Sequence, residues 1–497
     1  MSPTTYPQLL RLLWPEMIVT VTALAVVALD LLLRRSRLRV RFAAASCVAS
    51  LGCAGAILRL VLAPEQANLF DGMFLANPLT QLVQIALLVL TILALLLSVE
   101  SDFTENAGEF VLLILTATVG MMFLVASQDL LVIFIALELL SLSLYVLAGF
   151  DKRRPRSSEA ALKYFLFGGM SAAFLLYGFS LLYGLASSTS LFHIAAAVHG
   201  QPLNPLVIIA IVTIAIGFGF KVAAAPFHFW APDVYQGAPA PSAAFIASGS
   251  KVASFFIFFQ VTAVGLAGAE GTLAWPRMVS GWLPVLVAIA AVSMLLGNLA
   301  ALAQSSLRRL LAYSAIAHAG YMLLAIVAHT QQSLAGLLYY VLTYALATLG
   351  TFGVIAVIEE QIGGDKISNL DGLSRRAPVL SACLFVFVLS LAGIPPLAGF
   401  FAKFYLFTSV LAAAPGSRVL LLLVAFAIAM SAVSLYYYVQ VLKRIYVANP
   451  TIEAKDIQSS LLSRLVICLI AASVLLLGCA PRLLLTWIEA AIHASGL

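Results

Sequence analysis

The stretch GFGFKVAAAPFHFWAPDVY, residues 217–235, decides how the rest of the chain is interpreted. It begins within an apolar, helix-like run, yet it contains Lys221, Pro226, His228 and Asp233. A lysine at the centre of a membrane helix costs about 2.5–3.5 kcal/mol, and a proline inside a helix kinks or breaks it. A break at membrane depth persists only where it is buried in protein or lines a wet cavity. Broken helices that carry ionisable residues are typical of ion pathways in transporters.

The composition around this stretch is that of a membrane protein. Of the 497 residues, 63% are hydrophobic and 10% are charged, and apolar runs long enough to span a bilayer recur from end to end. The net charge of +6 does not indicate nucleic-acid binding, because the basic residues lie in short loops and form no extended patch. Residues 1–9 lack the basic start and cleavage site of a secretory signal, so we expect the first apolar run to remain as a span.

The sequence contains no pattern for redox or hydrolytic chemistry. Its five cysteines fall inside apolar runs without CxxC or Cys/His spacing, so we expect no metal site, iron–sulfur cluster or disulfide framework in this chain. We expect each cysteine to be a small buried side chain. There is also no P-loop, no GxGxxG after a strand and no nucleophile-plus-base motif.

The apolar runs predict an all-α membrane protein of about 14 transmembrane helices. They cover residues 10–33, 42–62, 79–99, 109–126, 129–149, 159–185, 204–225, 242–267, 280–303, 307–328, 332–358, 377–413, 417–446 and 459–488.

The run 377–413 resembles the opening stretch. As one helix it would be about 55 Å long, too long for a hydrocarbon core of about 30 Å. Gly393-Ile394-Pro395-Pro396 marks the predicted break, and Lys403 follows it. The chain therefore has two proline-broken segments, each with one lysine.

These two segments lie five spans apart, which predicts two five-helix repeats. Because each repeat has an odd number of spans, the second is inverted relative to the first. We expect N-terminal helices 1–3 in residues 1–100, the first repeat (helices 4–8) in 105–270, the second (helices 9–13) in 278–447 and helix 14 in 455–497.

The basic residues predict the orientation. With the N-terminus outside, eighteen of the 27 lysines and arginines fall in inner loops. They are Arg34, Arg35, Arg37, Arg39, Arg41, Lys152, Arg153, Arg154, Arg156, Arg308, Arg309, Lys366, Arg375, Arg376, Lys443, Arg444, Lys455 and Arg464. The outer side takes Arg11, Arg59, Arg277, Arg418 and Arg482. Both termini are therefore expected outside.

Four lysines not assigned to either side lie inside predicted spans, and among the acids only Glu138 lies near the middle of one. The lysines are Lys163, Lys221, Lys251 and Lys403. Facing lipid, these charges would together cost about 12–18 kcal/mol, more than the roughly 5–15 kcal/mol that stabilises a whole fold. They must therefore face the bundle interior, pair with one another or touch water. Burial favours the neutral amine and a nearby carboxylate favours the ammonium, so a Glu–Lys pair that opens and closes suits proton transfer.

Structural roles remain open for several of these positions. Lys163 lies only four residues into its span, where its side chain can reach surface water. Glu138 can be an interhelical structural acid. His228 can satisfy carbonyls freed by the break, and His318 can be an ordinary buried histidine.

Three stretches carry a resemblance to a known family: FKVAAAPFHFWAPDVYQGAP (220–239), LLAYSAIAHAGY (310–321) and LAGIPPLAGFFAKFYLF (391–407). Nearly the whole chain resembles the antiporter-like membrane subunits of respiratory complex I. It is most similar to the branch called subunit N in bacteria and chain 2 in mitochondria and plastids. The sibling subunit M typically has a glutamate where Lys403 stands, and subunit L carries a long lateral helix after its spans.

The resemblance implies a role for each charged position. Glu138 and Lys221 would form the charge pair of a first half-channel, with Lys163 tuning or feeding it. Lys251 would be the central relay, and Lys403 the connecting lysine of the second half-channel.

The resemblance also implies the wider function. His228 and His318 would be secondary members of the proton path. The chain would be a proton-translocating subunit of NADH–quinone oxidoreductase, with FMN, iron–sulfur clusters and quinone held elsewhere in the complex. Its partners would be neighbouring antiporter-like and small hydrophobic membrane subunits, the lipid bilayer and protons, but no nucleic acid. Its place would be the bacterial inner membrane, as a multi-pass protein with both termini periplasmic.

Two alternatives remain. A subunit of a multisubunit sodium/proton antiporter shares this fold and most of these residues. A membrane scaffold subunit that pumps nothing itself is the second.

Overall fold

The structure is a computed structural model that describes residues 10–199, 204–274, 279–449 and 457–496. Residues 1–9, Arg277 and Lys455, on which expectations were placed above, lie outside the described residues, as do the predicted domain boundaries at 278 and 455.

The described chain is almost entirely helical. Its α-helices are α2 (Trp14–Leu32), α3 (Leu38–Leu62), α4 (Pro78–Ser98), α5 (Ala107–Val125), α6 (Leu130–Ala148), α7 (Pro155–Ala186), α8 (Leu191–Val198), α9 (Pro205–Lys221), α10 (Trp230–Gly237), α11 (Ala240–Ala247), α12 (Gly249–Gln260), α13 (Trp282–Leu302), α14 (Leu307–Ala328), α15 (Gln331–Ile362), α16 (Leu373–Arg376), α17 (Pro378–Ala392), α18 (Ala398–Ala413), α19 (Arg418–Tyr446), α20 (Leu461–Cys479) and α21 (Arg482–Ala494). Short elements complete the list: β1 (Ala67–Leu69), η1 (Phe70–Gly72), β2 (Phe74–Ala76), a π-helical turn η2 (Val261–Gly265) and η3 (Ile367–Leu370). The predicted all-α membrane fold is confirmed.

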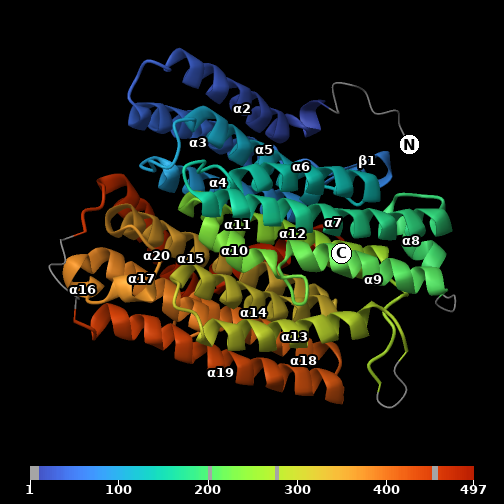
Figure 1. Cartoon of the computed structure of the whole chain (residues 1–497). Helices are drawn as coiled ribbons and strands as arrows, with labels where there is room; N and C mark the ends of the chain where they lie inside the picture. Colours follow the sequence, from blue (N-terminus) through green and yellow to red (C-terminus); the bar gives the residue numbers. More distant parts are fainter. Residues whose placement is uncertain (1–9, 200–203, 275–278, 450–456, 497) are drawn as a thin grey trace.

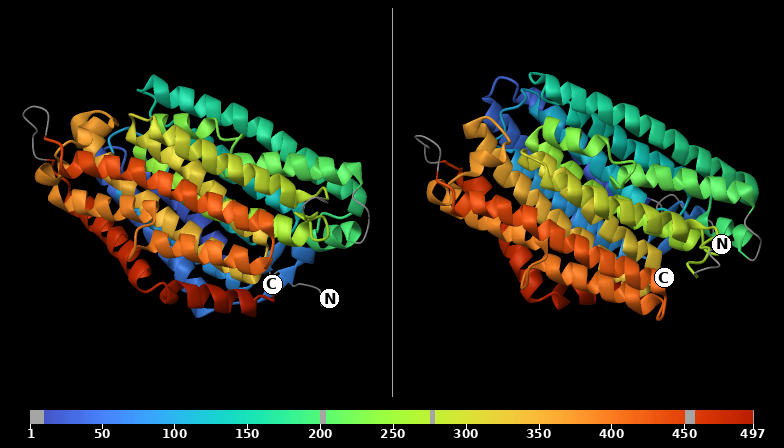
Figure 2. Two further views of the ribbon diagram at one scale, coloured as in Figure 1. Left: turned by 90° about the horizontal axis from the view of Figure 1, so that it is seen from below. Right: turned by 60° about the horizontal axis from the view of Figure 1, so that its bottom comes forward.

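The long helices lie side by side in one slab, with α2 at one edge and α19 at the opposite edge (Figures 1 and 2). Contacts between connecting loops gather the basic loops at one end of the slab. Arg153 donates a hydrogen bond to the carbonyl of Asp102, and the amide of Gly372 donates to the carbonyl of Arg444. We call this the basic end.

Sequence signals set many helix ends. The Asn77 side chain accepts a hydrogen bond from the amide of Thr80 and begins α4, and Asp129 does the same for the first amides of α6. Prolines occupy the first turn of α7, α9 and α17, where the missing amide hydrogen costs nothing.

Twelve segments of the described chain are long and apolar enough to cross a membrane. The helices α9, α17 and α18 are apolar but shorter than a full span, because both segments that contain them are broken. The count of about 14 spans therefore stays a prediction.

Both predicted breaks are present. α9 ends at Lys221 and α10 begins at Trp230, with Pro226 between them. α17 ends at Ala392 and α18 begins at Ala398. Gly393 closes α17 with a φ of +87°, a left-handed conformation that favours glycine.

Two features differ from the sequence-based expectation. The run 242–267 was expected to be one helix, but α11 and α12 are separated at Ser248. Small residues flank this position, and Gly/Ser pairs are common sites of kinks. The run 459–488 was also expected to be one helix. It divides into α20 and α21 at Pro481, which cannot donate the amide hydrogen bond that a continuous helix needs.

Burial identifies the axis of the bundle. The most apolar windows of α11–α12 and α14 are 100% and 94% buried, whereas that of α19 is 28% buried. A side chain on α12, α14 or the facing side of α15 is therefore shielded from both lipid and water.

Candidate functional site

Lys221 lies in the last turn of α9, directly before the first break. Its ammonium donates a hydrogen bond to the hydroxyl of Ser141 on α6 and lies 5.8 Å from the centre of the Tyr145 ring. Glu138 is three residues before Ser141, so the two are neighbours on the surface of α6. The described residues contain no ion pair within 4.0 Å between Lys221 and Glu138. The fold therefore brings the two residues to one region and leaves Ser141 as the direct partner.

Glu138 lies on the outward side of α6. It is half-buried, and it falls in a stripe with the exposed residues Leu131, Ile135, Leu142 and Val146. Their spacing of three or four residues places all five on one helix face. A carboxylate on such an apolar face is costly in lipid. We therefore expect this face of α6 to contact something other than lipid chains.

Lys163 belongs to the basic end. Its ammonium forms ion pairs of 2.7 Å with both Glu159 and Asp233, and Arg309 pairs with the other oxygen of Asp233 at 2.7 Å. Burial alone would raise the pKa of Asp233, but the hydrogen bonds from Lys163 and Arg309 outweigh it and hold this pKa below its ordinary value. The network joins α7, α10 and α14. Its members Asp233 and Arg309 were not chosen from the sequence as site residues.

Lys251 lies in α12, three residues after the break at Ser248. Its side chain is buried, with 2% of the residue exposed. It donates a 3.0 Å hydrogen bond to the carbonyl of Ala315 on α14 and lies 5.3 Å from the centre of the Tyr344 ring on α15. Both partners are neutral, so among these contacts no carboxylate compensates the ammonium.

Lys403 lies in α18, just after the second break. It donates hydrogen bonds to the carbonyls of Ala392 at 3.0 Å and Leu391 at 3.3 Å, and to the hydroxyl of Ser431 at 2.9 Å. The carbonyls at the end of a helix have no partner within that helix. The break therefore supplies the acceptors that hold Lys403.

His318 connects these two lysines through tyrosines. Its Nδ1 is 2.8 Å from the hydroxyl of Tyr340, and its ring centre is 5.0 Å from that of Tyr344, the ring beside Lys251. On the other side, its ring centre is 5.8 Å from that of Tyr321, and the Lys403 ammonium lies 5.4 Å from the same Tyr321 ring.

The tyrosines extend this cluster toward α13 and α19. The hydroxyl of Tyr438 lies 3.4 Å from His318 Nε2 and hydrogen-bonds the hydroxyl of Ser314. Asn298 donates to the hydroxyl of Tyr321 at 3.0 Å and accepts from Tyr437 at 3.2 Å. A small cavity of about 10 Å³, lined by His318 and Tyr344 among others, adjoins the cluster and is close to the volume needed for one water molecule.

We name Tyr321, Tyr340, Tyr344 and Tyr438 the tyrosine cage. Sequence reasoning missed it, because tyrosines in apolar spans look like packing residues. The spacing of Tyr340 and Tyr344, four residues apart on one helix, was the available signal.

His228 lies in the segment between α9 and α10. It is buried, its ring stacks on Phe229 at 4.7 Å, and its Nδ1 has no hydrogen-bond partner among the described residues. It is thus near the first break, and its free nitrogen can bind water.

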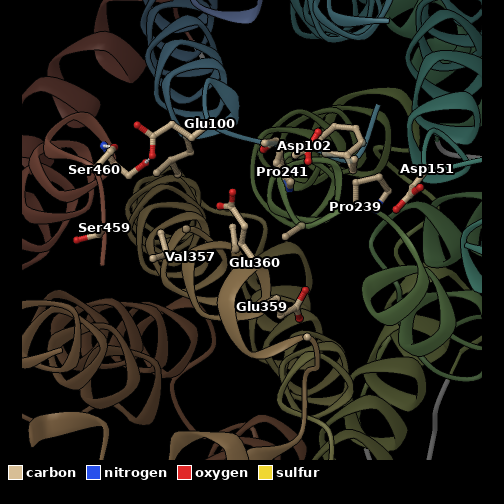
Figure 3. A pocket seen from close by; sticks show the side chains of 18 of the residues that line it. Glu100, Asp102, Asp151, Pro239, Pro241, Val357, Glu359, Glu360, Ser459 and Ser460 are labelled. Atoms are coloured by element: carbon tan, nitrogen blue, oxygen red, sulfur yellow. Dashed lines mark hydrogen bonds between the residues drawn. The ribbon is translucent and has the colours of Figure 1, made fainter. Parts of the chain in front are cut away.

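A cavity of about 430 Å³ opens at the basic end; we call it the vestibule. Carboxylates from α15 and from the α4–α5 and α6–α7 connections surround it (Figure 3): Glu100, Asp102, Asp151, Glu359 and Glu360. Arg308 lines it, pairs with Glu359 and donates to the carbonyls of Gln236 and Ala238.

Among the described residues, several buried polar atoms on α10, α11 and α15 have no hydrogen-bond partner. They include the hydroxyls of Tyr235 on α10, Ser242 on α11 and Thr348 on α15. The Tyr235 ring contacts Phe352 of α15 at 5.8 Å, and Thr348 is one helical turn from Tyr344. Because buried polar groups are nearly always hydrogen-bonded, such atoms mark positions for water molecules.

In the described residues, no three His, Cys, Asp or Glu side chains gather in a way that could hold a metal ion. The site is instead built from lysines, tyrosines and one histidine on broken or central helices. Fold and site together define a class: a multi-pass membrane protein with an antiporter-like arrangement of broken helices and buried lysines.

The chain belongs to the family described as "NADH:quinone oxidoreductase/Mrp antiporter, TM", whose model matches residues 127–431. It is 55% identical over 501 residues to the NADH-quinone oxidoreductase subunit N 2 of Acidobacterium capsulatum, covering 98% of this chain and 100% of that one. The resemblance to the subunit N branch is thereby confirmed.

Comparison with solved structures agrees with this family assignment. A chain of respiratory complex I from Thermus thermophilus matches with a TM-score of 0.77 and 35% identity, over 95% of this chain and 98% of that chain. A chain of the Mrp complex from Dietzia sp. matches with a TM-score of 0.80 over 97% of each chain, but at 21% identity. That second likeness shows a shared fold alone.

Proposed function

We propose that this chain is a proton-translocating membrane-arm subunit of NADH–quinone oxidoreductase, driven by quinone reduction elsewhere in the complex. The observation that carries the proposal is the run of polar contacts from Lys251 through the tyrosine cage and His318 to Lys403. Hydroxyls, imidazole and amines can each accept and donate a proton, and the run lies along the buried axis of the bundle. The relatives named above support the assignment to this complex.

The central residues have distinct roles in this proposal. Lys251 takes up a proton and releases it, and none of its contacts described above is a carboxylate that would hold the ammonium in place. His318 and the tyrosine cage, here secondary members of the path, pass the proton on, and Lys403 receives it beside the second break.

The first half of the path depends on the region of the first break. Lys221 and Glu138 act as an adjustable pair with Ser141 between them, so that a small movement of α6 or α9 changes how well the ammonium is compensated. Lys163 tunes this region from the basic end through Asp233. His228 is a secondary site for a proton or a water molecule.

The basic end is proposed to face the cytoplasm of a bacterium, across the inner membrane, with both termini on the periplasmic side. The excess of lysine and arginine in its loops supports this orientation. The vestibule is then the entrance for protons, and its carboxylates concentrate cations at the opening.

We further propose the two inverted repeats over 105–270 and 278–447, flanked by the additions 1–100 and 455–497. Matching breaks support the relation: α9 ends at Lys221 beside its break, and α18 carries Lys403 directly after its own.

The α6 stripe around Glu138 is proposed to be covered by another membrane subunit, either a neighbouring antiporter-like subunit or a small hydrophobic one. The cost of a carboxylate in lipid supports this. We propose that FMN, iron–sulfur clusters and quinone are held by other subunits and that this chain has no redox centre. No nucleic acid takes part.

One experiment tests the function as a whole. The complex is isolated through a tag on this chain, its subunits are identified, and it is reconstituted into vesicles. We expect flavin and iron–sulfur subunits to co-purify and NADH oxidation to drive proton movement. Lys221→Met is expected to lower proton movement while NADH oxidation by an artificial acceptor continues.

Other outcomes identify the alternatives. Co-purification with small hydrophobic subunits alone, and proton movement driven by a sodium gradient without NADH, would make the chain an antiporter subunit. Unchanged pumping by Lys221→Met in a fully assembled complex would support the scaffold.

A further inference from the structure

Glu16 is a buried acid outside the path of lysines. It lies in the first turn of α2, and 2% of the residue is exposed. The side-chain amide of Gln84 on α4 donates a 2.8 Å hydrogen bond to Glu16 Oε1 and a 3.2 Å hydrogen bond to the carbonyl of Met122 on α5. Glu16 is thus held where three helices meet.

The second oxygen of this carboxyl group is what requires explanation. Glu16 Oε2 is buried and has no hydrogen-bond partner among the described residues. If the group were ionised, one neutral amide would be the sole side-chain donor to a buried anion. The start of a helix favours negative charge, but this effect is weaker than the cost of removing a carboxylate from water. A neutral acid avoids this cost of a buried anion, since Gln84 would then bind its carbonyl oxygen and the proton would be carried by Oε2.

A small cavity lies beside this region, at the end of the bundle opposite the basic end. Its volume is about 20 Å³, and Pro15 and Gln84 line it together with Arg11, Arg59 and Glu65. This volume is sufficient for one water molecule. Gln84 therefore contacts Glu16 and also lines a position that water can occupy.

The charged groups around the cavity neutralise one another. Glu65 pairs with Arg59 at 2.6 Å and with Arg11 at 3.4 Å, and its carbonyl accepts a hydrogen bond from Gln81. In the described residues no ion pair reaches Glu16 from α2, α3, α4 or α5. No cation is therefore available to hold the carboxylate form.

We propose that Glu16 is a proton-binding carboxylic acid that exchanges its proton with the outer compartment through the cavity beneath the Arg59–Glu65 ion pair. The inference goes beyond the lysine path. It rests on the proposed function only in assigning this end of the bundle to the outer compartment. Loss of the proton would leave an anion among α2, α4 and α5, so the packing of α2 is linked to this protonation. Sequence reasoning missed Glu16 because it lies near the start of a span, where an acid is normally solvated.

The test uses infrared difference spectroscopy on the whole purified complex, exchanged from H₂O into D₂O. A protonated carboxyl group has a carbonyl-stretch band that shifts on exchange. We expect Glu16→Gln to lose one such band and Glu109→Gln to keep it. Glu109 is the matched control, because it also occupies the third position of a helix, α5, but is exposed.

A second pair of variants tests the hydrogen bond and the route. Gln84→Leu removes the donor to Glu16 Oε1, and we expect the same band to move to higher frequency. Ala76→Leu narrows the cavity that Ala76 lines, and we expect severalfold slower exchange of the band. The Gln84→Leu result also serves if Glu16→Gln assembles poorly.

Three results would overturn the proposal. They are a spectrum of Glu16→Gln that retains every exchangeable carboxyl band, no frequency change in Gln84→Leu, or unchanged exchange in Ala76→Leu. The bands are recorded on the resting complex, so their presence does not depend on pumping. Failure of this inference is therefore distinguishable from failure of the proposed function.

Discussion

Lys251 has the least compensated charge in the molecule's central region. Its hydrogen-bond acceptor is one backbone carbonyl, and its aromatic neighbour offers a modest attraction for a cation. Truncating one member of a buried ion pair is strongly destabilising, whereas replacing an unpaired buried charge by an apolar side chain of similar length leaves nothing unpaired. Lys251 can therefore be changed with little damage to the fold.

We expect Lys251→Met to lower NADH-driven proton uptake by at least about tenfold, since it removes a group that holds the proton during transfer. Assembly should be unaffected. The measurement is acidification of inverted membrane vesicles, with assembly followed on native gels. Lys443→Met, an exposed lysine at the basic end, is the control. Equal proton uptake by the two variants would remove Lys251 from the path.

Asp233 gives a pH-dependent prediction outside the spans. Its pKa in the folded protein is below the ordinary value of 3.8 because Lys163 and Arg309 bind its ionised form. A lowered folded pKa stabilises the protein above the unfolded value, and this stabilisation is lost as the pH falls through the folded value. We expect the wild-type complex to have a higher melting temperature than Asp233→Asn at neutral pH. The difference should disappear in strongly acidic buffer, and a gap that is constant with pH would contradict this.

The helix breaks act at the scale of whole elements. Each break ends one hydrogen-bonded helix and frees carbonyl groups, and at the second break Lys403 uses those of Leu391 and Ala392. The break and the lysine therefore form one functional unit. α12 also has a lysine shortly after a helix interruption, although the interruption is shorter: Lys251 lies three residues after Ser248.

Gly393→Ala tests the coupling between break and lysine. A methyl group at Gly393 would lie 3.0 Å from Lys403 Cδ and 3.1 Å from its Nζ, at a φ of +87°. Gly416, between α18 and α19 with a φ of +89°, has no atom within 4 Å of such a methyl group. Backbone strain should destabilise both variants by roughly 1–2 kcal/mol. We expect only Gly393→Ala to reduce proton uptake, measured in vesicles that contain equal amounts of assembled complex. If both variants lost proton uptake equally, backbone strain rather than the contact with Lys403 would be the cause.

At the scale of the whole molecule, the position of Glu138 has a consequence for assembly. The buried axis holds Lys251 and His318, whereas Glu138 lies at the surface of α6 in an apolar stripe. The first part of the proposed path therefore lies at an edge of this chain, and the remainder lies at its centre. A neighbouring subunit that covers the α6 stripe would complete it.

A photo-crosslinking amino acid at Leu142 tests this cover. Leu142 is exposed and lies one turn from Glu138 on α6. We expect ultraviolet irradiation of the native complex to link this position to another membrane subunit, identified by mass spectrometry. The same amino acid at Leu24, exposed on α2, is the control. Crosslinks from Leu142 to lipid alone would show that the stripe faces the bilayer.

The breaks at Pro226 and Pro395–Pro396 could be predicted from the sequence, because a proline disrupts a helix wherever the helix lies. The spans and the alternation of basic loops could be predicted for a similar reason, since both follow from the composition of continuous segments. The interruption at Ser248 was not predicted, because its small residues are also compatible with an unbroken helix.

Among the site residues, Lys221, Lys251 and Lys403 were identified from the sequence by their cost in a membrane, a property of each residue alone. The partners of these lysines depend on how each helix is rotated about its own axis and on which helices touch, and no local segment contains that information. The tertiary structure alone therefore gave Lys221 the hydroxyl of Ser141, linked Lys251 to Lys403 through His318 and tyrosines, and buried Glu16 among α2, α4 and α5. Helices far apart in the sequence make these contacts by packing together.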